Sequence, residues 1–222
     1  MQSLLQETLQ PATTALLKAI DASLNSNTML FKVRSEQIIT TSNAQEILNL
    51  FLHSPLFRDM FLEVDQLRGL LSYSTWDFID GEPVQLFPSG NPLLEPLQLI
   101  LTPMNEQSFA ERLHWMLTSA ESPYQKQVSE QRAQEILRDF FWEVFTPQSW
   151  PIEQPLAQQF WHGHPWSFCA VAPNFLPSTG YYYASEEYEL PDFAYFDGGK
   201  RDTCTFFYSK DIFYLLLTNG SP

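Results

Sequence analysis

The run Ile212-Phe213-Tyr214-Leu215-Leu216-Leu217 is the longest uninterrupted apolar stretch of the 222-residue chain. Successive side chains of a β-strand point to opposite faces of a sheet, so a strand of this composition has to be buried on both faces. A second apolar stretch, Thr203 to Tyr208, precedes it, and the intervening Ser209-Lys210-Asp211 is short enough to join two strands as a hairpin. The sequence therefore predicts a hairpin whose second strand is central in its sheet.

The rest of the chain divides into a helical part and a strand-rich part. Helical spacing of apolar residues recurs through the first two thirds, whereas the C-terminal third has further strand-like segments at 166–172, 180–183 and 193–196. These patterns predict an α+β fold, in which the helix-rich N-terminal two thirds packs on a mainly antiparallel sheet contributed largely by the C-terminal third. We expect residues 1–222 to form a single domain, and we place any weaker subdivision near the proline-punctuated stretch 146–156.

Local signals in the first two thirds indicate where several elements begin. The β-like stretches 28–33 and 38–41 are separated by polar residues and predict a small hairpin. Four serine or asparagine residues precede helical patterns and predict helix starts at Ser42, Ser54-Pro55, Asn105 and Ser122-Pro123. We expect the last of these helices to be the longest, running roughly from Pro123 to Phe145.

The charge of the chain is strongly one-sided. Twelve Lys and Arg residues stand against 26 Asp and Glu residues, which gives a net charge of −14. Two segments without any Lys or Arg, 69–111 and 139–199, hold 14 of the acids, a number equal to the whole net charge. Nucleic acids and anionic membranes are bound through Lys and Arg, so this composition disfavours both and favours a basic protein partner.

The second base-free segment combines its acids with 17 of the 33 aromatic residues. Aromatic side chains supply rigid contact area in interfaces, and carboxylates steer a basic partner towards them. We therefore predict a partner-binding site whose residues are Tyr181, Tyr182, Tyr183, Glu186, Glu187, Glu189 and Asp192. The alternative is that the aromatics form a buried sheet while the acids lie in solvated loops.

Catalytic patterns in the sequence are weak. His162 and His164 would point to the same face of an extended segment and could bind a metal with a third ligand, but the spacing is weak evidence and a polar turn before Pro165 is the better explanation. Cys169 and Cys204 lie in strand-like segments without a CxxC motif, which is typical of inert core thiols. The sequence contains no nucleotide-binding fingerprint or phosphate loop, and we predict no cofactor.

These observations favour a binding protein over an enzyme. No secretory signal or membrane-spanning run is visible and cysteines are sparse, so we expect a cytoplasmic location. The leading hypothesis is an inhibitor or immunity protein that engages a basic protein through an acidic, aromatic surface. A secretion chaperone or adaptor is one alternative, and a metal-assisted hydrolase that uses His162 and His164 is the other.

Overall fold

The structure, a computed structural model, describes residues 1–68, 76–79, 82–85, 99–145, 166–173 and 203–220. Its main feature is a six-stranded sheet with the strand order β1-β2-β8-β7-β6-β5, in which every neighbouring pair is antiparallel. The strands are β1 (Gln2–Ser3), β2 (Ser26–Arg34), β5 (Leu99–Met104), β6 (Ser167–Pro173), β7 (Thr203–Ser209) and β8 (Ile212–Gly220). A separate two-stranded ribbon consists of β3 (Trp76–Ile79) and β4 (Glu82–Gln85).

Strand β8 is central, as its composition predicts. It pairs along its whole length with β2 on one side, from Ile212 opposite Arg34 to Gly220 opposite Ser26, and with β7 on the other side. Phe213, Leu215 and Leu217 are buried in one hydrophobic cluster, while Tyr214 and Leu216 are buried in a second. The two clusters lie on opposite faces of the sheet because the side chains of a strand alternate.

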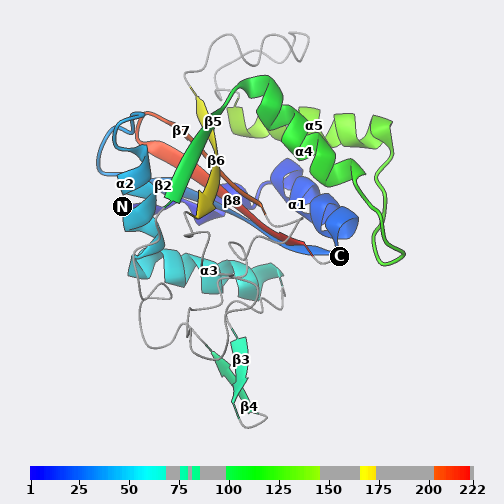
Figure 1. Cartoon of the computed structure of the whole chain (residues 1–222), viewed down its shortest axis with the longest axis horizontal. Coiled ribbons are helices and arrows are strands. Elements are labelled where there is room, and N and C mark those ends of the chain that lie inside the picture. Colours follow the sequence, from blue (N-terminus) through cyan, green and yellow to red (C-terminus); the bar gives the residue numbers. More distant parts are fainter. Residues whose placement is uncertain (69–75, 80–81, 86–98, 146–165, 174–202, 221–222) are drawn as a thin grey trace, which may run out of the picture.

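Helices cover both faces of the sheet, which gives three layers (Figure 1). On one face lie α2 (Ala44–Leu52) and α3 (Pro55–Arg68), and on the other lie α1 (Pro11–Leu24), α4 (Glu106–Thr118) and α5 (Glu130–Phe145). A short 3-10 helix, η1 (Leu5–Thr8), precedes α1. The predicted α+β class is confirmed, and three of the six sheet strands come from the C-terminal third.

Aromatic side chains join each helical layer to the sheet. On the face of α2 and α3, Phe51 contacts Phe213 of β8 with ring centroids 5.2 Å apart, and Phe57 contacts Phe31 of β2 at 5.5 Å. On the other face, Phe109 of α4 contacts Phe207 of β7 at 5.2 Å. Aromatic pairs of this kind contribute about 0.5–1.5 kcal/mol beyond their buried area, so they help to fix each helix on its face.

The predicted hairpin of 28–33 with 38–41 is wrong. Only its first half is a strand, β2, and both neighbours of β2 come from elsewhere in the chain, because β1 lies on one side and β8 on the other. Residues 38–41 form a loop beside the β7–β8 turn, where Ser35 N donates to Asp211 O and Ile39 N donates to Lys210 O, both at 2.7 Å. The loop leaves Ile38 69% exposed.

Two of the four predicted helix starts are confirmed by capping hydrogen bonds. The Oγ of Ser54 accepts from Phe57 N at 3.2 Å at the start of α3, and the Oδ1 of Asn105 accepts from Ser108 N at 2.7 Å at the start of α4. Helix α2 begins at Ala44 rather than directly after Ser42, and the residue before it is Asn43, whose Oδ1 accepts from Thr40 N. Side-chain acceptors thus cap α3 and α4, whereas no side chain caps the first turn of α2.

The predicted start of the longest helix at Pro123 is wrong. Helix α5 is the longest that the described residues contain, but it begins at Glu130, after Ser129, whose Oγ accepts from Arg132 N. Residues 121–125 form a turn instead, because the Oε1 of Gln125 accepts hydrogen bonds from the backbone N of Glu121 and of Ser122. A side chain that satisfies these donors removes the need for a helical turn there.

The β7–β8 connection is shorter than predicted. Ser209 pairs directly with Ile212, so that Lys210 and Asp211 alone form the turn. Lys210 has a φ of 53°, the left-handed conformation that tight hairpin turns require.

The remaining fold predictions concern residues outside the described part. The expected strands at 180–183 and 193–196 lie there, as does the whole stretch 146–156. The single-domain organisation stays a prediction. None of the described helices is both long enough and apolar enough to cross a membrane.

Glu143 of α5 holds the first turn of α1 in place. One of its carboxylate oxygens accepts from Thr13 N at 2.7 Å and from Thr13 Oγ1 at 2.6 Å, and the other accepts from Ala12 N at 3.0 Å. These donors would otherwise have no partner, because the first backbone N–H groups of a helix have none within it. A carboxylate is also favoured at the positive end of the helix dipole.

We predict that Glu143→Ala lowers the free energy of unfolding by about 1–3 kcal/mol, the usual cost of leaving partly buried donors unsatisfied. The neighbouring Asp139→Ala serves as a control, because the Asp139 side chain is 51% exposed and bonds only to Arg138 among the described residues. Urea unfolding of both variants measures the difference. Equal stabilities for the two variants would contradict the capping role of Glu143.

Candidate functional site

The residues predicted to bind a partner lie outside the described part of the chain. This holds for all seven, Tyr181, Tyr182, Tyr183, Glu186, Glu187, Glu189 and Asp192, and also for His162 and His164. Their arrangement stays a prediction. In the described part, no group of three His, Cys, Asp or Glu side chains is placed to hold a metal ion.

Most cationic side chains of the described part are already paired with carboxylates. Six ion pairs join a Lys or Arg to an acid: Lys32–Glu7, Arg34–Asp211, Arg58–Asp59, Arg68–Asp21, Arg132–Glu135 and Arg138–Asp139. Exposed pairs of this kind add little to stability, about 0–1 kcal/mol each. They do neutralise the bases, so the excess of acids dominates the described surface.

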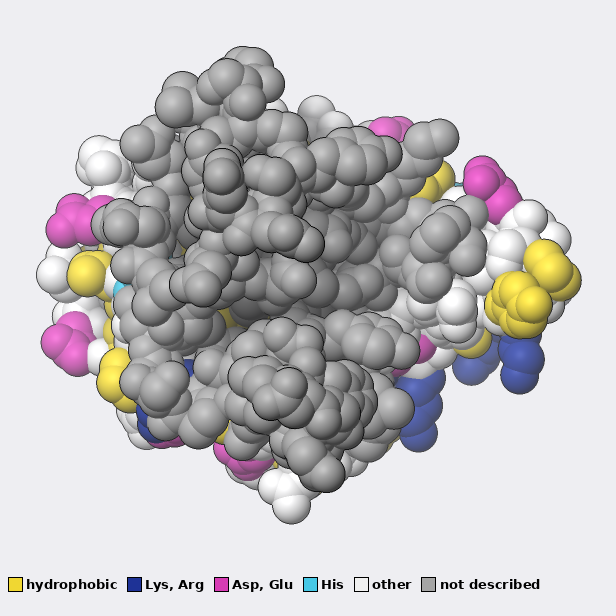
Figure 2. Space-filling model, turned by 60° about the horizontal axis from the view of Figure 1, so that its bottom comes forward, with side chains coloured by type: hydrophobic (Ala, Val, Ile, Leu, Met, Phe, Trp, Pro, Cys, Tyr) yellow, Lys and Arg dark blue, Asp and Glu magenta, His cyan; other side chains and the backbone are white. Residues whose placement is uncertain are grey.

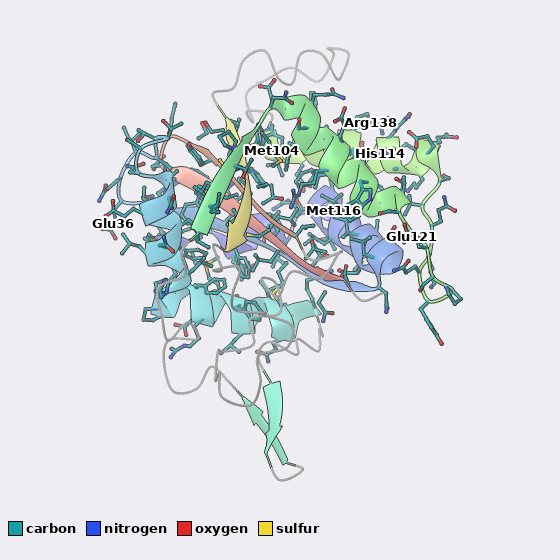
Figure 3. The ribbon with its side chains drawn as sticks, viewed as in Figure 1. Glu36, Met104, His114, Met116, Glu121 and Arg138 are labelled. Atoms are coloured by element: carbon teal, nitrogen blue, oxygen red, sulfur yellow. The ribbon has the colours of Figure 1, made fainter. Side chains whose placement is uncertain are left out.

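The acids themselves serve different purposes. Glu143 caps α1, Asp139 pairs with Arg138 and Glu111 accepts from Gln107 Nε2, so at least three of the 14 acids in the base-free segments are engaged within the molecule. Figure 3 shows Glu36 at the margin beside α2 and Glu121 at the opposite margin. The described carboxylates therefore lie on more than one side of the molecule.

The outer side of α2 has the properties of a binding surface. A surface hollow of about 540 Å³ is lined by Ser42, Gln45, Glu46, Asn49, Leu50 and His53. The hollow is wide open to solvent, so it suits a surface contact rather than an enclosed small-molecule ligand. Figure 2 shows acidic and hydrophobic side chains close together along the left edge of the molecule, the side on which Figure 1 places α2.

The sequence of α2 explains why this side is exposed. Ala44, Ile47, Leu48, Phe51 and Leu52 form the buried face of the helix, packed in the same cluster as Phe31 of β2. Leu50 falls outside this helical period and is 55% exposed. An apolar residue out of phase with the buried face was a signal that the sequence analysis missed.

The C-terminal end of α2 is held by His53. Its Nδ1 lies 2.7 Å from Asn49 O, and since a carbonyl oxygen only accepts, Nδ1 carries the proton of this hydrogen bond. The backbone N of His53 donates to the same carbonyl at 3.1 Å. These bonds fix the helix end that carries three of the residues lining the hollow.

The two cysteines are buried among hydrophobic side chains in the layer of α2 and α3, and both are free thiols. Burial raises the pKa of Cys204 and of Cys169, so neither forms a thiolate readily. The geometry agrees with the interpretation as inert core thiols. The histidine on α4, His114, contacts Glu130 at 2.9 Å on the surface, far in the fold from the end of α2.

Arg112 of α4 reaches the backbone of β7, and its guanidinium is incompletely hydrogen-bonded. Its Nη2 donates a long hydrogen bond of 3.5 Å to Cys204 O, and its buried Nε has no partner. The flanking Thr203 and Thr205 lie on the same sheet face as Phe207, which contacts α4, and their hydroxyls also lack partners. Desolvation lowers the pKa of Arg112, because no carboxylate compensates for its burial among the described residues.

We predict that Arg112→Met raises the free energy of unfolding by about 1–3 kcal/mol, since an apolar side chain of similar length avoids the cost of desolvating a partly buried guanidinium that has no carboxylate partner among the described residues. Arg138→Met is the matched control, because Arg138 is about half exposed and paired with Asp139. Thermal and urea unfolding provide the comparison. A destabilised Arg112→Met protein would mean that the guanidinium makes a favourable interaction in this position.

Comparison with known proteins gave no relative. No family model, no curated protein and no solved structure matches the chain.

Proposed function

We propose that the protein is a cytoplasmic binding protein, of the inhibitor or immunity type, that engages a basic protein partner through an acidic and aromatic surface. The observation that carries this proposal is the concentration of 14 acids in two segments without Lys or Arg, the second of which also holds 17 aromatic residues. Opposite charge accelerates association with a basic partner, and a few aromatic side chains supply most of the affinity once they are buried.

The described part of the chain supports the proposal in two ways. Its bases are mostly engaged in ion pairs with the protein's own acids, which leaves little cationic surface for nucleic acid. Its two cysteines are free and buried, as expected for a reducing compartment. The predicted contact residues are Tyr181, Tyr182, Tyr183, Glu186, Glu187, Glu189 and Asp192.

The experiment begins with affinity capture using the full chain as bait, followed by purification of the captured protein and a binding measurement with the two pure components. We predict that the triple substitution Glu186→Lys, Glu187→Lys and Glu189→Lys weakens binding at least about tenfold, chiefly through a slower association rate. Reversing three charges removes attraction and adds repulsion. Surface plasmon resonance separates the association and dissociation rates.

The matched control reverses three exposed carboxylates outside both base-free segments, with Asp59→Lys, Glu130→Lys and Glu135→Lys. The control should change binding much less than the triple substitution in 186–189. An equal loss in both variants would mean that only the total charge matters, and a captured partner with an acidic surface would contradict the proposal. Light scattering on the free protein tests the chaperone alternative, which requires a dimer.

A further inference from the structure

The hollow on α2 combines a carboxylate, which accepts hydrogen bonds, with an exposed apolar side chain. The Glu46 side chain is exposed and lines the hollow, and no Lys or Arg among the described residues lies within ion-pair distance of it. Leu50, one helical turn further along, is 55% exposed beside it. A carboxylate and a leucine at this spacing present a negative charge and an apolar contact on the same strip of helix.

Two further features extend this strip. Asn49 also lines the hollow, although its Oδ1 is buried and has no hydrogen-bond donor among the residues that the structure describes. Ile38, 69% exposed, belongs to the loop that enters α2, and Asn43 Nδ2 donates to Ile38 O at 3.0 Å, which ties this loop to the helix start. The outer side of α2 thus has acceptors and apolar groups, and its lining includes no Lys or Arg among the residues that the structure describes.

The chemistry of the strip selects its occupant. A Lys or Arg side chain has an aliphatic stem that packs on apolar surface and a cationic head that donates hydrogen bonds. The stem matches the exposed side chain of Leu50, and the head matches the exposed carboxylate of Glu46. An acidic segment would be repelled by Glu46 and by the net charge of −14.

We infer that the α2 hollow is a docking site for a basic, amphipathic segment of the protein partner, with a Lys or Arg side chain lying along Leu50 towards Glu46. The inference rests on the proposed function and adds a second contact region to residues 181–192. Recognition of this kind places alternating apolar and cationic side chains of the incoming segment on a fixed helix face.

The test uses the full chain labelled with ¹⁵N and three synthetic amphipathic peptides as probes. The peptides have the same length and the same leucine positions, and their polar positions are all Lys, alternating Lys and Glu, or all Glu. We expect the all-Lys peptide to shift the amide resonances of residues 42–53 and to bind at least about tenfold more tightly than the all-Glu peptide. The mixed peptide should bind with intermediate affinity.

A matched pair of variants locates the binding. Glu46→Lys with Leu50→Arg should weaken binding of the all-Lys peptide at least about tenfold. Glu63→Lys with Leu67→Arg should leave it nearly unchanged, because these are an exposed glutamate and a 55% exposed leucine at the same spacing on α3. Circular dichroism and thermal unfolding of both variants verify that the fold is intact.

The outcomes separate this inference from the proposed function. Binding of the all-Lys peptide that shifts other resonances, or that is insensitive to Glu46→Lys with Leu50→Arg, overturns the α2 site and leaves the proposed function standing. Equal binding of all three peptides overturns the basic character of the occupant. Absence of binding by the all-Lys peptide also overturns the α2 site. The proposed function is tested independently by the capture experiment with the triple variant.

Discussion

Burial of β8 on both faces is the constraint on which the rest of the molecule depends. Phe213, Leu215 and Leu217 need cover on one side of the sheet, and Tyr214 and Leu216 need it on the other. Burying one such side chain stabilises the fold by about 1.5–3 kcal/mol, so leaving either face open would cost several times that amount. A single helical layer cannot satisfy this strand. The helices therefore divide into two groups, one on each face of the sheet. Helix α2 packs on the face that carries Phe213, and its outer side is exposed.

The position of β8 could be predicted because the necessary information is local. Six consecutive apolar residues leave no polar face for solvent, whichever elements provide the cover. The helix starts at Ser54 and Asn105 were predictable for the same reason, since a capping side chain and the amide it accepts from are three residues apart. Interactions within a few residues of each other leave a readable pattern.

The failed predictions depend on distant partners. The stretch 38–41 has the β-branched composition of a strand, but β2 already pairs with β1 and with β8, and nothing near residue 38 reveals that competition. Ser122-Pro123 has the composition of a helix start, and the side chain of Gln125 closes a turn there instead.

At the candidate site, Leu50 stood out of phase in the sequence, whereas the hollow beside it depends on how α2 lies on the sheet. Arg112 follows Phe109 at helical spacing, but the lack of a carboxylate partner for it among the described residues becomes visible only in the folded molecule.

The acidity of the chain has more than one physical role. Part of it is internal, because Glu143 caps α1 and Asp21 binds Arg68 where α1 and α3 meet the end of β2. Desolvation raises the pKa of Asp21 in spite of the neighbouring guanidinium, so such acids contribute to architecture at a cost. Other described acids lie on the surface, where some pair with Arg or Lys, as Asp139 does, and Glu46 has no such partner among the described residues. Only this external fraction is available to attract a partner.

The most direct test of a docking role for these acids is the dissociation constant of the purified complex over a series of salt concentrations. Salt screens exposed charges over about 10 Å at 0.1 M, so an interface formed by carboxylates and a basic partner weakens steadily as the ionic strength rises. We predict a dissociation constant that increases at least about tenfold between low and high salt, mainly through the association rate. A constant that does not change with salt would contradict the account, because the acids would then serve solubility and architecture alone.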